Sequence, residues 1–421
     1  MSSASQRLSA IAGQISGGGE SAARKRLLAK NPDDVVITFA ARTPLTKARK
    51  GGLKDTPLDE LLISLLTNVR EKSKIDPNLV EDVCVGNTLN PAGAYVARSS
   101  VLAAGFPETT AASVVNRFCS SGLLAVQQIA NQIIAGSIDV GIAVGAESMS
   151  TNPDPGAPTF SEKVLNHHLA SQNQQPMGQT SENVAGQFSI SRARHDEFAA
   201  ASYQKAERAQ KAGWFDDEIV PVKTTIKDPK TGEVKEIVVS RDDGIRYGTT
   251  AESLSKIRSA FPQWQPSHTT GGNASQITDG AAALVMMKRS RAEQLGQPIV
   301  AKFVGATVIG LEPRIMGIGP SIAIPKILSK TGLSTDDVDI FEINEAFASM
   351  GVYCVQKLNL PPAKVNPRGG AIAFGHPLGA TGARQVVTAL SELRRTNKRI
   401  AVTSMCVGTG MGMAGVFVSE H

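Results

Sequence analysis

Two cysteines and one histidine each follow an apolar segment and lie in a turn of small residues. Cys119 is in "NRFCSSGLL", His376 in "AIAFGHPLGATGAR" and Cys406 in "SMCVGTGMGMAG". A thiolate attacks carbonyl carbon, and an imidazole beside it can take the proton of the thiol. Claisen chemistry also needs a separate acid or base for the α-carbon, which a second thiol can supply. The three segments therefore predict covalent acyl transfer, if the fold brings them together.

Cys119 is the candidate nucleophile. The Ser-Ser-Gly turn after it opens a predicted helix, whose first backbone N–H groups and positive dipole end favour a thiolate. The alternative is a small buried packing residue, which is the commoner role of a lone cysteine. Cys406 precedes a loop of four glycines that begins with Gly408. The backbone N–H groups of such a loop suit an oxyanion on a thioester carbonyl, and the alternative is a glycine-rich strand edge.

A repeat along the chain links His376 to Cys119. Asn87 and Asn344 each end an apolar, strand-like segment, in "VEDVCVGNTLN" and "VDIFEINEAFA". Asn87 precedes Cys119 by 32 residues, and Asn344 precedes His376 by 32 residues. Similar helical and strand segments follow in both places, so we interpret the chain as a duplicated unit rather than two unrelated stretches. Asn344 can then orient a water or a carbonyl beside His376, and Glu345 reads as a helix-start acid.

The elements that must position these residues alternate between strands and helices, which predicts a layered α/β fold. Residues 31–150 with 277–296 form the expected N-terminal half, and residues 297–421 form the C-terminal half. Residues 151–276 contain loop-like segments, a polar helical stretch and a charged hairpin, and we interpret them as an inserted loop domain. Residues 1–30 are rich in Ser, Gly and Ala, so we expect a flexible segment there.

The composition narrows the range of functions. The 421 residues include 44 Lys and Arg against 38 Asp and Glu, a modest excess that suits an anionic substrate. Aromatic residues make up 5%, which argues against a stacking surface for nucleic acid. None of the four cysteines forms a CxxC pair, so a zinc site has no support and a reducing compartment is expected. No apolar run reaches the roughly 18 residues of a membrane span.

In order and spacing, "NRFCSSGL", "NEAF", "GHPLGATGAR" and "CVGTGMGMA" resemble the four active-site motifs of thiolases. The resemblance runs from about Asp33 to Val418 and is nearest to peroxisomal 3-ketoacyl-CoA thiolases. It implies two similar βαβαβαββ halves in a five-layered αβαβα core with a loop domain. It also implies an acyltransferase of fatty-acid β-oxidation, which cleaves 3-ketoacyl-CoA to acetyl-CoA and a shortened acyl-CoA. Coenzyme A is then a co-substrate, and no metal or tightly bound cofactor is expected.

The same resemblance implies a role for each motif residue. Cys119 would carry the acyl group, and His376 would be its base. His376 would also form one oxyanion hole with a water held by Asn344, and the backbone N–H groups of Cys119 and Gly408 would form a second. Cys406 would be the acid and base for the α-carbon of acetyl-CoA and for the incoming CoA thiol.

Segments of the loop domain resemble the CoA contacts of the family. The matching residues are Arg246 and Ser253 for CoA, Ser275 at the pantetheine, and Met177 over the acyl end. Pro176 stands where acetoacetyl-specific relatives often have His, which favours the degradative, longer-chain branch.

The N-terminal residues resemble a type 2 peroxisomal targeting peptide, with Arg7-Leu8, five further residues and then Gln14-Ile15. This resemblance implies the peroxisomal matrix and an import receptor as a partner. An Arg- and Ser-rich mitochondrial presequence, and hence the mitochondrial matrix, is the alternative. The family resemblance also implies a homodimer.

Three other functions are distinguishable from the leading one. A biosynthetic acetoacetyl-CoA thiolase would differ in chain length and direction. A ketoacyl synthase of the same fold lacks the second catalytic cysteine, so Cys406 argues against it. A non-catalytic acyl-CoA or lipid carrier need not keep Cys119, His376 and Cys406 together.

Overall fold

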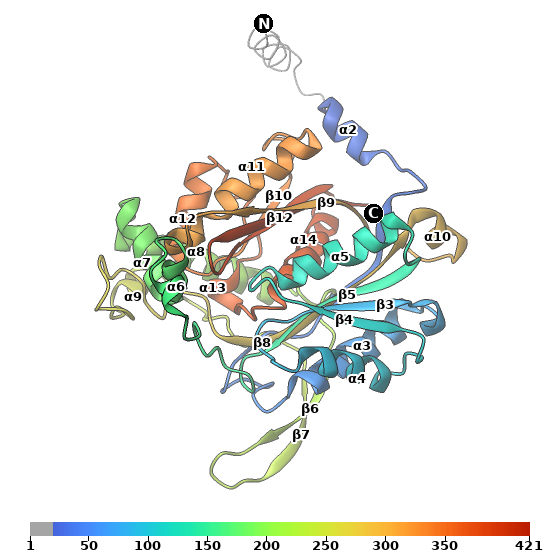
Figure 1. Ribbon diagram of the computed structural model, residues 1–421, viewed down its shortest axis with the longest axis horizontal. Helices are drawn as coiled ribbons and strands as arrows, with labels where there is room; N and C mark the ends of the chain where they lie inside the picture. The colour runs from blue at the N-terminus through green and yellow to red at the C-terminus, as the bar shows by residue number, and fades with distance from the viewer. Residues whose placement is uncertain (1–19) are drawn as a thin grey trace, which may run out of the picture.

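The computed structural model describes residues 20–421, and the expected targeting peptide lies outside them. Strands and helices alternate as predicted and stack in layers (Figure 1). The strands are β1 (Val35–Arg42), β2 (Thr46–Lys47), β3 (Asp82–Gly86), β4 (Ala111–Val115), β5 (Val140–Ser148), β6 (Val222–Lys227), β7 (Val234–Val239), β8 (Thr278–Lys288), β9 (Ala301–Gly310), β10 (Ile340–Ile343), β11 (Ile400–Val407) and β12 (Met411–Ser419).

The helices fall into a core set and a loop-domain set. The core helices are α2 (Ala22–Leu28), α3 (Leu58–Ser73), α4 (Gly93–Ala103), α5 (Ser121–Ala135), α10 (Arg289–Gln294), α11 (Pro320–Thr331), α12 (Ala348–Lys357), α13 (Ala371–Phe374) and α14 (Thr381–Arg395). The helices between residues 151 and 276 are α6 (Glu162–Leu165), α7 (Met177–Gln187), α8 (Arg192–Lys211) and α9 (Ala251–Ser255). The polar helical stretch expected there is thus divided between α7 and α8.

Each half contributes its own group of hydrogen-bonded strands. The path through the sheet is β10-β11-β12-β9-β1-β8-β5-β3-β4. Within the N-terminal group, β3 is parallel to β4 and β5. β8, which follows the loop domain in the sequence, pairs antiparallel with β1 and β5. The two groups meet through a short pairing between β1 and β9, which joins Val36 to Lys302 and Ile37 to Ala301. The residue boundaries that we expected for the halves remain a prediction.

Helices cover the outer faces of both strand groups and fill the space between them. In Figure 1, α11 lies above β9, β10 and β12, while α3 and α4 lie below β3, β4 and β5. α5 and α14 run through the middle, where they contact each other and strands of both groups. The order of layers is therefore helix, sheet, helix, sheet, helix. The N-terminal ends of the two central helices lie beside each other.

The central helices form where apolar residues repeat every three or four positions. α5 buries Leu123, Val126, Ile129 and Ile133 completely, and each such side chain contributes roughly 1.5–3 kcal/mol to folding. The helix ends at Gly136, whose φ of 72° gives the left-handed conformation that glycine tolerates without strain. The first six residues of α5 and the first ten of α14 are all buried, so the N-terminal ends of both helices are held firmly in the core.

Buried charges attach the loop domain to the core. Arg42 in β1 binds Asp242 through two hydrogen bonds of 2.8 Å each and Glu218 through one of 2.6 Å. Although burial disfavours its charge, Asp242 and Glu218 raise the pKa of Arg42. Arg368 binds Glu218 from the other side at 3.1 Å and Glu392 at 2.8 Å. Because each buried charge has a partner, this network fixes the domain without an isolated charge.

The last third of the segment that we expected to be flexible is ordered. α2 packs Ala23, Leu27 and Leu28 against the apolar cluster under α11. Arg24 binds Asp339 at 3.0 Å, and Arg26 donates to the carbonyl of Thr331 at 2.9 Å. The expectation of flexibility is therefore wrong for residues 22–28, because apolar and basic side chains after the triple glycine find partners on the C-terminal half.

Between residues 20 and 421, no helix is both long enough and apolar enough to cross a membrane.

Candidate active site

The turn before α5 presents Cys119. Phe118 adopts a φ of 46°, and Ser121 closes the turn by accepting from the N–H of Arg117 at 2.9 Å and donating to the carbonyl of Phe118 at 2.7 Å. Thr88, which follows β3, also donates to the Phe118 carbonyl, at 3.1 Å. The turn is thus held from both sides, and the Cys119 side chain is buried.

Burial, rather than the helix end, dominates the electrostatics of the Cys119 thiol. Loss of hydration raises its pKa to about 12, although the backbone N–H groups of Gly408 and of Cys119 itself act in the opposite direction. The expected thiolate is therefore not the resting form, and the thiol keeps its proton until a base removes it. The two N–H groups are directed at the sulfur, so they can also stabilise an oxyanion formed beside it.

Thr381 determines which nitrogen of His376 carries the proton. Nδ1 of His376 lies 2.6 Å from Oγ1 of Thr381, and this hydroxyl donates its hydrogen to the carbonyl of Pro377 at 3.0 Å. Nδ1 is then the donor, and Nε2 carries the lone pair. Burial, with a smaller contribution from Arg384, lowers the pKa of His376 to about 3. The imidazole is neutral near pH 7, which is the form that a general base requires.

The side-chain amide of Asn344 donates to the unprotonated nitrogen of His376. Its Nδ2 is 3.2 Å from Nε2 of His376, and its own backbone N–H donates to the carbonyl of Ser404 at 2.9 Å. Oδ1 of Asn344 is buried and has no hydrogen-bond partner within residues 20–421. An unpartnered buried acceptor beside a base suits a bound water or a polar substrate group.

A hairpin turn brings Cys406 and Gly408 to the same place. β11 and β12 pair from Ile400 to Val407, and Thr409 and Gly410 make the turn with positive φ values of 69° and 84°. Cys406 is buried in contact with Met350, their sulfur atoms 4.0 Å apart. Loss of hydration and the neighbouring Cys119 raise its pKa, so the resting form of Cys406 is also the thiol.

One cavity of about 360 Å³ collects predicted residues from distant parts of the chain. Cys119, His376, Ser275 and Met177 all line it. The rest of the wall is largely apolar, with Met149, Ala260, Phe261, Ile277, Met316, Phe347 and Leu378. Asn344, Cys406 and Gly408 are not wall residues, but they lie next to His376 or Cys119. The reactive residues predicted from sequence therefore meet in or next to one largely apolar cavity.

Two predicted CoA contacts lie outside this cavity. Arg246 is exposed on the loop domain, its guanidinium carbon 5.9 Å from the ring centroid of Tyr203. It forms no ion pair with any other described residue. Ser253 is exposed in the first turn of α9, where it and Thr250 cap each other. Their exposure is compatible with a polar part of a ligand whose other end enters the cavity.

Sequence reasoning missed the residues that hold the reactive ones. Thr381 orients His376. Gln276 accepts from the N–H of His376 at 3.0 Å and donates to the carbonyls of Gly244 and Ala373, both at 2.9 Å. It thereby ties the His376 turn to the loop domain. Gln276 follows Ser275 directly and Thr381 lies within the "GHPLGATGAR" motif, so their motif positions were the available signals.

Glu147 is a third missed residue. It is fully buried at the end of β5 and accepts four hydrogen bonds. Burial raises its pKa to about 7, although the N–H groups of Gly379, Leu89 and Thr88 and the side chain of Asn87 oppose the shift.

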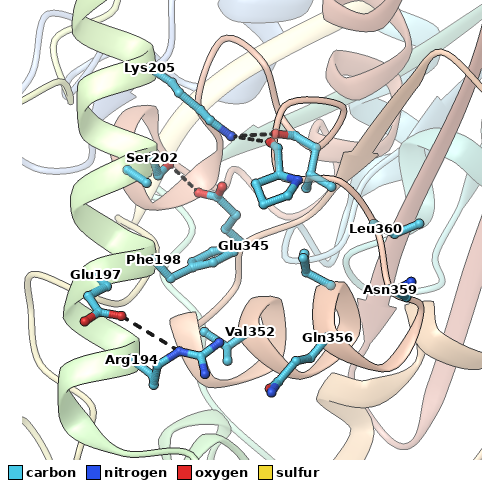
Figure 2. Close-up of a pocket in the computed structure, with 14 residues that line it drawn as sticks. Arg194, Glu197, Phe198, Ser202, Lys205, Glu345, Val352, Gln356, Asn359 and Leu360 are labelled. Carbon is cyan, nitrogen blue, oxygen red and sulfur yellow. Dashed lines mark hydrogen bonds and ion pairs between the residues drawn. The ribbon is translucent and has the colours of Figure 1, made fainter.

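Glu345 is not the helix-start acid that the sequence indicated. α12 begins three residues later, and the carboxylate accepts from the side chains of Ser202 at 2.6 Å and Asn366 at 2.8 Å. Figure 2 shows it pointing toward α8, beside Ser202 and Lys205, at a second cavity of about 430 Å³. This cavity contains none of the predicted catalytic residues. Glu345 therefore anchors the turn after Asn344 from outside the reactive cavity.

Within residues 20–421, no group of three or more His, Cys, Asp or Glu side chains is arranged to hold a metal ion.

Two family models match nearly the whole chain. They are described as "Thiolase, N-terminal domain", matching residues 35–290, and "Thiolase, C-terminal domain", matching residues 297–419. A peroxisomal 3-ketoacyl-CoA thiolase of Yarrowia lipolytica is 54% identical over 396 residues, which are 94% of this chain and 95% of the relative.

Solved structures agree with these matches. The dimeric peroxisomal thiolase of Saccharomyces cerevisiae has a TM-score of 0.87 and 48% identity, over 94% of this chain and 100% of that one. Another structure of the peroxisomal 3-ketoacyl-CoA thiolase of this yeast has a TM-score of 0.76 and 43% identity, with the same coverage. It is described as five-layered and constructed from two core domains of identical topology. The fold expected from the sequence is confirmed.

Proposed function

The chain belongs to the thiolase family, and on this premise we propose that it cleaves 3-ketoacyl-CoA with CoA in peroxisomal fatty-acid β-oxidation. The products are acetyl-CoA and a shortened acyl-CoA. The enzyme is an acyltransferase, and CoA enters as a co-substrate rather than a resident cofactor. Like the relative from Yarrowia lipolytica, it is peroxisomal.

The observation that carries the assignment of roles is the meeting of Cys119 and His376 in one apolar cavity. Cys119 has a raised pKa and His376 a lowered one, so the pair rests as thiol and neutral imidazole. Nε2 of His376 has a lone pair for the thiol proton, as the hydrogen bond to Thr381 requires. A nucleophile that loses its proton only during the attack suits an apolar cavity, because the resting thiol and imidazole are both uncharged.

The first step forms an acyl-enzyme. Sγ of Cys119 attacks the 3-keto carbon while Nε2 of His376 takes the thiol proton. The oxyanion that forms on the keto carbon, beside the Cys119 sulfur, accepts from the backbone N–H groups of Cys119 and Gly408. The thioester oxygen of the departing acetyl-CoA accepts from Nε2 of His376, now protonated, and from a water at Asn344. The bond between the α-carbon and the keto carbon then breaks, and its electron pair goes to the enolate of acetyl-CoA. Cys406 gives its proton to this carbanion.

The second step returns the enzyme to its starting state. The Cys406 thiolate takes the proton of an incoming CoA thiol, and the CoA sulfur attacks the acyl carbon on Cys119. The backbone N–H groups of Cys119 and Gly408 face the oxyanion of this intermediate. The Cys119 thiolate leaves and takes back the proton held by His376, so atoms and charge balance over the cycle.

CoA extends from the cavity to the surface of the loop domain. Its pantetheine passes Ser275, its polar end reaches Arg246 and Ser253, and Met177 lies over the acyl end. The unpaired charge of Arg246 fits a phosphate group. The working form is a homodimer, because the similar yeast protein is described as dimeric. An import receptor binds the peptide from Arg7 to Ile15, which lies outside the described residues.

The direct test is CoA-dependent loss of 3-ketoacyl-CoA absorbance, with four-carbon and longer substrates measured side by side. Faster loss with the longer chain is the expected result. Activity confined to acetoacetyl-CoA would indicate the biosynthetic branch, and no activity on any chain length would favour the carrier alternative.

A further inference from the structure

We propose that Glu147 is a positioning residue that sets the alignment of Cys119 with His376; this inference rests on the proposed function. A single oxygen, Oε2 of Glu147, accepts from the backbone N–H of Thr88 at 3.0 Å and from that of Gly379 at 2.9 Å. Thr88 belongs to the N-terminal half and Gly379 to the C-terminal half. The carboxylate thus joins the two turns on which the reacting pair depends.

On the Cys119 side, Glu147 holds the turn that follows β3. Its Oε1 accepts from Nδ2 of Asn87 at 2.9 Å and from the N–H of Leu89 at 3.2 Å. The hydroxyl of Thr88 donates to the carbonyl of Phe118 at 3.1 Å, one residue before Cys119. A path of two hydrogen bonds therefore runs from Glu147 through Thr88 to the Cys119 turn.

On the His376 side, Glu147 holds the turn between His376 and α14. Gly379 follows His376 by three residues and lies in direct backbone contact with the N-terminal half. A Cβ added to Gly379 would lie 2.7 Å from the carbonyl oxygens of Ala146 and Gly86. A Cβ on Gly122, in α5, would lie 2.8 Å from the Gly379 carbonyl. Backbone packed this closely transmits a displacement instead of absorbing it.

The hydrogen-bond chemistry requires a carboxylate at this position. All four partners of Glu147 are N–H donors, two at each oxygen. Glutamine has nearly the same shape, but its NH₂ group would face two donors in either orientation of the amide. Asn87 cannot turn to compensate, because its Nδ2 also donates to the Ala146 carbonyl at 2.9 Å and its Oδ1 accepts from Asn90 at 3.1 Å. Glu147→Gln therefore moves at least one turn.

The experiment compares Glu147→Gln with Glu392→Gln in the full-length protein. Glu392 is also a buried carboxylate, but it binds Arg368 and Arg395 near the far end of α14. The readouts are kcat, the KM for CoA and the alkylation rate of Cys119 by iodoacetamide, all at a temperature well below the Tm of each protein. Alkylation reports proton transfer from Cys119 without any CoA substrate.

We expect Glu147→Gln to lower kcat by about 10- to 100-fold and the alkylation rate by about tenfold, since a misplacement of about 1 Å can cost about 100-fold in rate. The KM for CoA should stay within about twofold. Glu392→Gln should lower Tm but leave kcat and alkylation unchanged. A Glu147→Gln protein with parental kcat and alkylation, whatever its Tm, would overturn the proposal.

A second variant, Thr88→Val, tests the proposal even if the Glu147→Gln protein does not fold. Thr88→Val keeps the backbone bond to Glu147 and removes only the hydroxyl that reaches Phe118, at a half-buried site. It should slow alkylation of Cys119, and parental alkylation in this variant would also overturn the proposal. An inactive parent would refute the proposed function, whereas the alkylation comparison would still decide the role of Glu147.

Discussion

Nδ1 of His376 lies 2.6 Å from Oγ1 of Thr381, at the first residue of α14. The same hydroxyl bonds to the carbonyl of Pro377, as residues at the start of a helix often do. One hydroxyl thus caps a turn and sets the tautomer of the base. Because Nδ1 holds the proton, Nε2 carries the lone pair, which is the one that the proposed mechanism uses to take the proton of Cys119.

Replacing Thr381 by Val should impair the base without displacing the chain. Valine keeps the shape of threonine but cannot accept from Nδ1 of His376, so the imidazole loses its fixed tautomer. We expect kcat to fall by roughly 10- to 100-fold, within the range that a general base contributes. Thr381→Ser retains the hydroxyl and should keep most of the activity. Equal activity of the two variants would contradict the assignment of Nε2 as the base.

The two cysteines should separate in a mass-spectrometric assay of the acyl-enzyme. Cys406→Ala retains Cys119 and His376, so it should still take an acyl group from a simple acyl-CoA, although thiolysis should fall by at least about 100-fold. Cys119→Ala should show no adduct. A stable acyl group on the Cys119→Ala protein would contradict the assignment of Cys119 as the acylated residue.

The burial of His376 should appear in the pH dependence of stability. Its pKa falls from 6.5 to about 3 on folding, so between these pH values the unfolded chain binds a proton that the folded protein does not bind. This contribution to stability is fully present above about pH 6.5 and decreases as pH falls toward 3. The slope in that window is at most about 1.4 kcal/mol per pH unit.

Urea unfolding of His376→Gln between about pH 4 and 7 tests this prediction. The variant should lose less stability than the parent as the pH falls. The matched control is His167→Gln, because His167 is exposed and its replacement should leave the parental slope. Parallel curves for His376→Gln and the parent would mean that folding does not shift the pKa of His376.

Arg42 should be among the most sensitive positions for stability. Arg42→Met removes the positive charge between Asp242 and Glu218 and leaves their carboxylates partly unpaired in the interior. Breaking a buried pair in this way costs about 3–5 kcal/mol. The urea midpoint should fall strongly, whereas Lys256→Met, which removes an exposed pair with Glu252, should not move it. A small effect at Arg42 would mean that water reaches the network.

Two truncations should separate targeting from stability. Removal of residues 2–19 leaves α2 in place, so activity and Tm should be parental while peroxisomal import is lost. Removal of residues 2–30 also deletes the contacts of Arg24 and Arg26 with the C-terminal half and should lower Tm by about 2–4 °C. Import is best scored in cells without the full-length chain, since a dimer partner could carry the truncated one. Import of the shorter truncation there would contradict the targeting assignment.

The sequence alone determined the order of the elements, and it predicted which residues react. Apolar periodicity located α5, and alternation of strands and helices predicted the layers, because these signals depend on neighbours along the chain. The repeat of Asn87 and Asn344 predicted that Asn344 would lie beside His376. In the structure, Nδ2 of Asn344 is 3.2 Å from Nε2 of His376. Matching motifs allowed the family to be recognised before any geometry was known.

Only the tertiary structure decided the protonation states and the supporting contacts. The helix end after Cys119 indicated a thiolate, but the pKa of a buried group depends on every atom packed around it, and burial raises this one to about 12. No local pattern marked Glu147, because its partners Thr88 and Gly379 come from different halves of the chain. Types and order of residues are local properties of a sequence, whereas desolvation and hydrogen bonds between distant turns exist only once the chain has folded.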